Sequence, residues 1–174
     1  MERIIQELIY GYVRDRQLCT RAVFAQKHPY AVLVYRQAQG TSGPETQQML
    51  VLSDELQAAV RVMRRDAHQY RVFALKHDRL TVGRGHENDI DLADGSVSKA
   101  HGHVERTASG LALVDHGSRN GSKVEGRALV KDQPALLSDG DVLHIGNVKV
   151  TYLSAGALFD FLTTLLDPRA TPGG

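Results

Sequence analysis

The stretch LTVGRGHENDIDLADGSVSKAHGHVE, residues 80–105, alternates short strand-like runs with turn-forming residues. The candidate strands lie at 80–82, 90–92 and 101–105, and clusters of Gly, Asn, Asp and Ser separate them. Short strands with turn signals roughly every eight to twelve residues are typical of a β-sandwich or β-barrel. The stretch therefore predicts a mainly β domain.

The same pattern of short strand-like runs between turn-forming residues continues on both sides of this stretch. Further candidate strands lie at 70–75, 111–115, 142–145 and 148–153. In the last of these, Val148, Val150 and Tyr152 alternate with other residues, as they do in a strand with one buried face. Gly146-Asn147 just before it suits a two-residue hairpin turn, in which positive φ is required.

The two ends of the chain show helical periodicity. Near the N-terminus, an apolar stripe predicts a helix that starts near Glu2. Residues 156–166 predict a closing helix with a second apolar stripe. The stripes comprise Ile4, Ile5, Leu8, Ile9 and Val13 in the first helix, and Leu158, Phe161, Leu162 and Leu165 in the second. We expect both helices to pack against the sandwich rather than to face a partner.

Between the first helix and the sandwich, the residues 30–35 (YAVLVY) predict a buried strand. Residues 37–48 lack apolar periodicity and predict a loop. Residues 49–65 fit either a strand followed by a helix or two strands. The expected division is an N-terminal α/β extension at 1–67, a binding domain at 68–153, and a C-terminal helix and tail at 154–174.

Composition restricts the class of protein. The chain has 174 residues, of which 42% are hydrophobic and 24% charged, as in ordinary globular proteins. The net charge of +1 offers no general attraction for nucleic acid or anionic lipid, so neither is expected as a partner. Cys19 is the only cysteine, and no signal peptide or membrane span is recognisable. We expect a cytoplasmic protein, and its oligomeric state stays open.

Polar motifs follow the candidate strands in a fixed order. A sandwich places several strand-connecting loops together at one end. A phosphothreonine brings a charge of about −1.5 to −2 and three acceptor oxygens, which a guanidinium, a hydroxyl and backbone N–H groups can bind. Arg84, Ser98 and the turn around Asn120 supply these groups. The motifs are Gly83-Arg84, Asn88-Asp89-Ile90, Ser98-Lys99-Ala100-His101, Asp115 with Gly117-Ser118-Arg119-Asn120-Gly121, and Asp139-Gly140-Asp141.

This succession resembles the forkhead-associated (FHA) domain over residues 70–152, about half of the chain. The resemblance implies an FHA-type β-sandwich of two antiparallel sheets that binds phosphothreonine. It also implies that Arg84, Ser98 and Lys99 contact the phosphate, that Asn120 holds the peptide backbone and that Arg119 lies beside both. Lys99 stands where the family more often has arginine, so phosphate binding is expected to be weaker.

Three further residues have supporting roles in this interpretation. The resemblance implies that Gly83 permits a tight entry into the Arg84 loop, that His101 holds neighbouring loops together and that Gly121 supports the site. His101 and His103, two residues apart, would share one face of a strand. No cysteine or third histidine is placed nearby in the sequence, so no metal and no cofactor are predicted.

Two functions remain open. The first is a non-catalytic binding module of bacterial-type Ser/Thr kinase signalling, whose partner is a phosphothreonine-containing protein, either a kinase or its substrate. The second is a phosphate-independent assembly protein that uses the 1–67 extension as its interaction surface. An enzyme with Ser98 as nucleophile and His101 as base is disfavoured, because no nucleophile elbow or oxyanion signature accompanies them. Which kinase, target or flanking residues are involved stays open, as does binding of the protein's own phosphorylated threonine.

Overall fold

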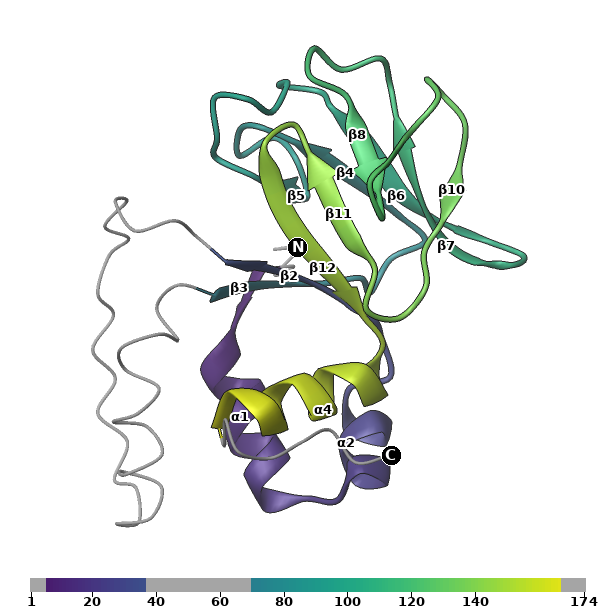
Figure 1. The fold of residues 1–174 in the computed structure, drawn as a ribbon. Coiled ribbons are helices and arrows are strands. Elements are labelled where there is room, and N and C mark those ends of the chain that lie inside the picture. Colours follow the sequence, from purple (N-terminus) through teal and green to yellow (C-terminus); the bar gives the residue numbers. More distant parts are fainter. Residues whose placement is uncertain (1–5, 37–69, 167–174) are drawn as a thin grey trace.

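The computed structural model describes residues 6–36 and 70–166, and within them the strands form two packed sheets (Figure 1). The larger sheet has the order β1 (Gln6–Leu8), β3 (Tyr70–Ala74), β2 (Val32–Arg36), β12 (Val148–Leu153), β11 (Val142–Ile145), β8 (Ser122–Val124) and β9 (Arg127–Ala128). The smaller sheet has the order β10 (Ala135–Leu136), β7 (Gly110–Asp115), β6 (Gly102–Thr107), β4 (Arg79–Gly83) and β5 (Ile90–Asp91). Described pairs are antiparallel except β4 with β5. The sandwich predicted from the sequence is thus confirmed.

The main core lies between the two sheets. Leu33 and Phe73 on the larger sheet meet Leu80 and Leu113 on the smaller one, and all four are buried. Removing a Leu or Phe side chain from water contributes roughly 1.5–3 kcal/mol each. This layer holds the two sheets face to face, so that their loops meet at the ends.

A second core lies on the other face of the larger sheet. Val32 and Val34 alternate with Leu33 on β2 and pack with Val72 against the helices. The helices are α1 (Ile9–Leu18), α2 (Arg21–Lys27) and α4 (Ala155–Leu166). Leu158 and Leu162 of α4 are fully buried there. The expectation that both terminal helices pack on the sandwich is confirmed.

The seven sandwich strands predicted from residue 70 onward are confirmed to within a few residues, and so is the closing helix. Strand β2 occupies the predicted 30–35 region and lies between β3 and β12, so the predicted extension contributes a strand to the interior of the larger sheet. The division at residue 67 stays a prediction. The predicted loop at 37–48 and the ambiguous 49–65 segment lie outside the described residues.

The predicted start of the first helix was wrong. Gln6–Leu8 forms strand β1, which pairs with β3, and the helix begins only at Ile9. The apolar spacing fitted a helix, but β3 offers an open edge whose backbone groups can pair with these residues. Strands β8, β9 and β10 were missed, because runs of two or three residues carry no readable alternation.

The predicted hairpin between β11 and β12 is present. Gly146 has φ of 59°, which suits glycine, and Ile145 pairs with Val148 across the turn. A Cβ atom at Gly146 would lie 2.6 Å from the carbonyl oxygen of Ser96. This turn therefore packs directly against the 92–101 loop, at the end of the sandwich where the predicted site lies.

Candidate functional site

Backbone hydrogen bonds tie the loop after β4 to the loop before β6. The Arg84 N–H donates to the Ser98 carbonyl at 2.9 Å, and Asn88 Nδ2 donates to the Lys99 carbonyl at 2.9 Å. A Cβ atom at Gly83 would lie 2.0 Å from the Lys99 carbonyl oxygen. Only glycine lets the two segments approach this closely. Arg84, Ser98 and Lys99 are thereby brought to one end of the sandwich.

The 117–121 loop joins the same group. The Ser98 hydroxyl oxygen accepts the backbone N–H of Arg119 at 3.1 Å. Asn120 Nδ2 donates to the Ser96 carbonyl at 2.7 Å. The Gly121 carbonyl accepts the N–H of Gly146 from the β11–β12 turn at 3.0 Å. The structure thus places the five predicted binding residues on three loops that contact one another.

The side chains of these loops reach the surface. Arg84, Lys99, Arg119 and Asn120 are exposed, and Ser98 is half-buried. Three of the five carry a positive charge, so the loop end can attract a dianionic phosphate group. The Ser98 oxygen is the acceptor in its contact with the Arg119 N–H, so its hydroxyl hydrogen is not used there and can be donated to an anion.

The buried side chain of His101 supports the loop that carries Ser98. It is 1% exposed, its Nδ1 accepts the Ser98 N–H at 3.2 Å, and its Nε2 lies 3.0 Å from Ser122 Oγ. Because Nδ1 accepts a hydrogen, the proton of the neutral ring sits on Nε2 and points to Ser122. Burial lowers the pKa of His101 below its ordinary 6.5, against the opposing effect of Asp115. His101 is therefore a neutral support for the Ser98 loop.

Asp115 organises the loop that carries Arg119 and Asn120. Its Oδ1 accepts the N–H groups of Gly117 and Ser118, each at 2.8 Å, and its Oδ2 accepts the Ser122 hydroxyl at 2.6 Å. Burial alone raises the pKa of this carboxyl, but the hydrogen bonds from Ser122 and Ser118 outweigh it and the pKa falls below 3.8. The carboxylate stays charged and fixes the turn.

Sequence reasoning missed Asp115, Ser122 and Ser96 as supports of the loops. The sequence carries a signal for Asp115, since an Asp with Gly and Ser two and three residues later is typical of a turn in which the carboxylate accepts nearby backbone N–H groups. Ser96 lies in a similar local turn, in which Asp94 accepts its N–H, but nothing nearby in the sequence indicates the long-range contacts of Ser96 and Ser122. Their partners, Asn120 and His101, lie 24 and 21 residues away.

The expectation that His101 and His103 share one face was wrong. His101 contacts Ser122 of the opposite sheet, whereas His103 stacks on His116 and lies 3.1 Å from Glu105. Strand β6 begins only at Gly102, so its alternation does not extend to His101. Within the described ranges, no group of three or more His, Cys, Asp or Glu residues is arranged to hold a metal.

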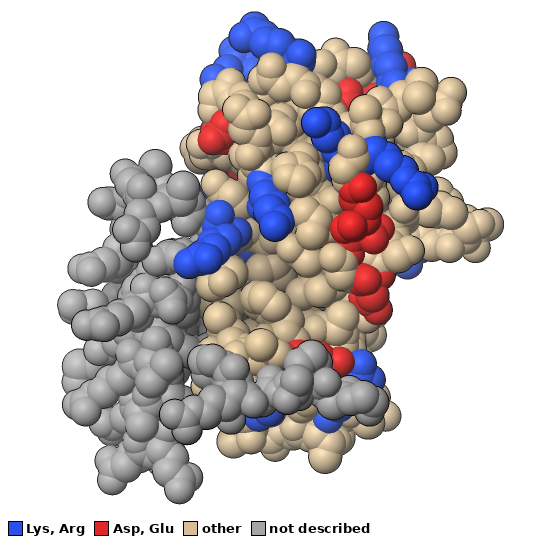
Figure 2. Space-filling model, in the orientation of Figure 1, with Lys and Arg blue, Asp and Glu red and all other residues tan. Residues whose placement is uncertain are grey.

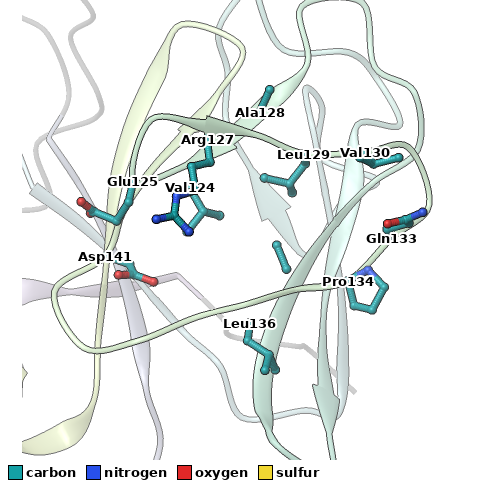
Figure 3. Close-up of a pocket in the computed structure, with 11 residues that line it drawn as sticks. Val124, Glu125, Arg127, Ala128, Leu129, Val130, Gln133, Pro134, Leu136 and Asp141 are labelled. Atoms are coloured by element: carbon teal, nitrogen blue, oxygen red, sulfur yellow. The ribbon is translucent and has the colours of Figure 1, made fainter.

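A groove of about 450 Å³ opens elsewhere, between the edge strands β9 and β10 (Figure 3). Val130 and Pro134 lie at one end of it, and Glu125, Arg127 and Asp141 at the other. None of the predicted binding residues lines this groove. The candidate site is therefore a loop surface rather than this cavity.

Among the residues described, none of the helices is both long enough and apolar enough to cross a membrane.

Comparison with known proteins identifies the sandwich. The family model described as FHA domain matches residues 80–146. The chain is 32% identical over 100 residues to an oxoglutarate dehydrogenase inhibitor of Corynebacterium efficiens, a match that covers 58% of this chain and 68% of that protein. It is 30% identical over 97 residues to the inhibitor of Corynebacterium jeikeium, which covers 56% of this chain and 65% of the relative, just under two thirds of its length.

A similar solved structure is that of Mycobacterium tuberculosis EmbR in complex with a low affinity phosphopeptide. The two chains are 28% identical, and the match covers 48% of this chain and 22% of EmbR with a TM-score of 0.44.

Proposed function

Because the chain belongs to the FHA domain family, we propose that it binds a phosphothreonine of another protein at the loop end of its sandwich. The observation that carries this proposal is the hydrogen-bonded junction of three loops, in which Ser98 contacts Arg119 and Asn120 contacts Ser96. In this proposal the Arg84 guanidinium pairs with phosphate oxygens, and Ser98 and Lys99 donate to them. Asn120 holds the peptide backbone and Arg119 lies beside the phosphate.

The biological setting is part of the same proposal. A module that binds only the phosphorylated form of a partner responds to a Ser/Thr protein kinase. The protein then recruits or inhibits that partner, which is a kinase or its substrate. The names of the inhibitors from Corynebacterium support a regulatory role of this kind.

The contacts of Ser98 support binding rather than catalysis. An acyl-transfer nucleophile needs its hydroxyl hydrogen-bonded to a base. His101 Nδ1 instead accepts the backbone N–H of Ser98, and the Ser98 hydroxyl oxygen contacts the Arg119 N–H. His101 Nε2 faces Ser122 and is engaged within the protein. We propose that the site catalyses nothing.

The test is fluorescence anisotropy with a phosphothreonine peptide library, its phosphoserine counterpart and the unphosphorylated peptides. We expect binding to the phosphothreonine peptides. A hydrogen bond to a charged group contributes roughly 1.5–3 kcal/mol, so Arg84→Ala should lower affinity about tenfold to several hundredfold. Arg127→Ala removes another exposed arginine, one that lines the groove, and should leave affinity unchanged. Indifference to phosphate across the library would refute the proposal.

One observation favours the second function, phosphate-independent assembly through the N-terminal extension. Leu18 and Val23 are 75% and 49% exposed on α1 and α2. Apolar side chains at the surface of neighbouring helices are candidate contacts for a partner. If this function holds, Leu18→Ser with Val23→Ser abolishes recovery of a partner that phosphatase treatment leaves bound.

A further inference from the structure

A row of basic side chains crosses the larger sheet outside the proposed site. Lys123 on β8 pairs with His144 on β11, and His144 pairs with Lys149 on β12. Residues paired across antiparallel strands project from the same face, with Cβ atoms about 5 Å apart. Lys123, His144 and Lys149 therefore lie side by side across three strands. We call them the basic row.

The basic row lies on the outer face of the sheet. Leu143 and Ile145, the neighbours of His144, point into the core between the sheets. Lys123 and Lys149 are exposed, and His144 is half-buried. Neither lysine has a carboxylate partner among the described residues. Both ammonium groups are thus available to an anion.

The two lysines lie on either side of His144, two strands apart. Neighbouring strands are about 4.8 Å apart, so the two lysine positions lie about 10 Å from each other. An anionic group placed over His144 is therefore within reach of both long side chains.

His144 adds a hydrogen-bond donor to the row. Its Nδ1 is buried without a hydrogen-bond partner. A proton on Nδ1 would be a buried donor with no acceptor, which is costly. The proton of the neutral ring therefore sits on Nε2, where it can be donated to a ligand between the two lysines.

The row is continuous with the proposed phosphothreonine site. Lys123 follows Asn120 by three residues, and Lys149 follows Asn147 by two. The Asn147 N–H donates to Ser96 Oγ at 2.9 Å, and Ser96 also accepts Asn120 Nδ2. With a rise of about 3.3 Å per strand residue, the row begins within about 10 Å of Asn120.

Charge on this face is distributed unevenly. Figure 2 shows Lys and Arg side chains over the upper and middle parts of this face, and a group of Asp and Glu side chains that lies beside and below them. Glu125 and Asp141 lie at the far ends of β8 and β11, away from the candidate site. An anionic peptide that extends from the loops over the sheet is therefore attracted by the basic row and repelled by the carboxylates beyond it.

We propose that the basic row is a second anion subsite for the same ligand. It binds an additional phosphate, or the carboxylate of an acidic residue, about three to five residues away from the phosphothreonine, because an extended peptide spans the distance in that number of residues. This inference rests on the proposed function. It names the class of peptide that the site prefers, namely one that carries two separated anionic groups.

The experiment measures peptide affinity by fluorescence anisotropy with the full chain. One peptide series carries a single phosphothreonine, and matched series add a second phosphate or a glutamate at each position up to six residues on either side. The variant is Lys123→Gln with Lys149→Gln. The matched control is Lys76→Gln with Arg106→Gln, which removes the same charge from exposed residues beside the loops at the other end of the sandwich. Thermal unfolding verifies that both double variants are folded.

We expect a second anion at one set of positions to tighten binding roughly three- to tenfold in the wild type and the control, since exposed ion pairs are individually weak. The Lys123→Gln/Lys149→Gln variant should lose that gain while it keeps its affinity for the singly phosphorylated peptide. The arms with phosphate and glutamate show which anion the row prefers.

The inference is overturned if the gain is absent in the wild type or is equal in all three proteins. It is also overturned if an oligonucleotide binds through the two lysines while the second anion has no effect, because the row then serves nucleic acid. If no phosphopeptide binds, both the proposed function and the second subsite are refuted. If singly phosphorylated peptides bind and the second anion brings no gain in affinity, only the second subsite is refuted.

Discussion

The hydroxyl oxygen of Ser98 accepts the backbone N–H of Arg119 at 3.1 Å, across 21 residues of sequence. This bond joins the loop before β6 to the loop after β7. It also turns the hydroxyl hydrogen of Ser98 away from Arg119 and leaves it available to a ligand. One side chain therefore both shapes the proposed site and supplies a donor to it.

Replacement of Ser98 should accordingly weaken phosphopeptide binding. Ser98→Ala removes the donor to the phosphate and the acceptor for Arg119, and we expect a loss of about ten- to hundredfold in affinity, as for one lost hydrogen bond to a charged group. Calorimetric titration is the measurement. Ser98→Thr keeps the hydroxyl and should retain most of the affinity. Equal affinities of Ser98→Ala and wild type would exclude this role.

Stability should fall in mildly acidic solution. Burial lowers the pKa values of His101 and His103 below 6.5, so the folded protein keeps both neutral while the unfolded chain takes up protons. Their contribution to stability is complete above pH 6.5 and is lost as pH falls toward the depressed folded values. Each pKa unit by which the folded value lies below the unfolded value lowers the free energy of unfolding by about 1.4 kcal/mol at low pH. Thermal unfolding should show a falling Tm from pH 7.5 to pH 5.

The matched variant for this titration is His101→Gln, which is neutral at every pH. It should be less stable than the wild type at pH 7.5 but show a flatter dependence on pH. The lowered pKa of Asp115 acts separately, because its contribution is present above about pH 3.8 and is lost only below that value. A wild-type Tm that stays constant between pH 7.5 and pH 5 would contradict the role given to the buried histidines.

Gly83 should be intolerant of even a methyl group. An added Cβ would lie 2.0 Å from the Lys99 carbonyl oxygen and 2.7 Å from the Asn88 amide. Gly83→Ala should cost about 1–3 kcal/mol through overpacking and weaken phosphopeptide binding by separating the loops. Gly95→Ala is the control, because nothing lies within 4 Å of its added Cβ. Chemical denaturation checks both, and similar midpoints for the two variants would speak against the tight junction.

Deletion of residues 1–67 should abolish folding of the sandwich. The deletion removes β2, whose Val32 and Leu33 are fully buried, and leaves β3 and β12 without the strand between them. We expect loss of cooperative unfolding in calorimetry. Leu18→Ser, which changes an exposed residue of the same region, should alter stability by no more than about 0.5 kcal/mol. A truncated protein that unfolds cooperatively at the wild-type temperature would show that the extension is a separate unit.

Much of the fold could be predicted because its signals are local. The β11–β12 hairpin follows from Val148, Val150 and Tyr152 alternating after Gly146-Asn147, and α4 follows from an apolar stripe. The loop positions of Arg84, Ser98 and Asn120 follow in the same way, since turn residues mark where strands end. What these side chains bind stays a prediction, and their contacts within the protein were not readable from the sequence.

The sequence by itself determined the longer strands, the turns between them and the polar residues that stand in the turns, because alternation and turn chemistry depend on neighbouring residues. Only the tertiary structure decided that Gln6–Leu8 extends a sheet edge, that β2 lies between β3 and β12, that Asp115, Ser122 and His101 share one buried network, and that Lys123, His144 and Lys149 form one row. These relationships depend on strand order and register. Both are set by pairing between segments far apart in the chain, for which no local pattern exists.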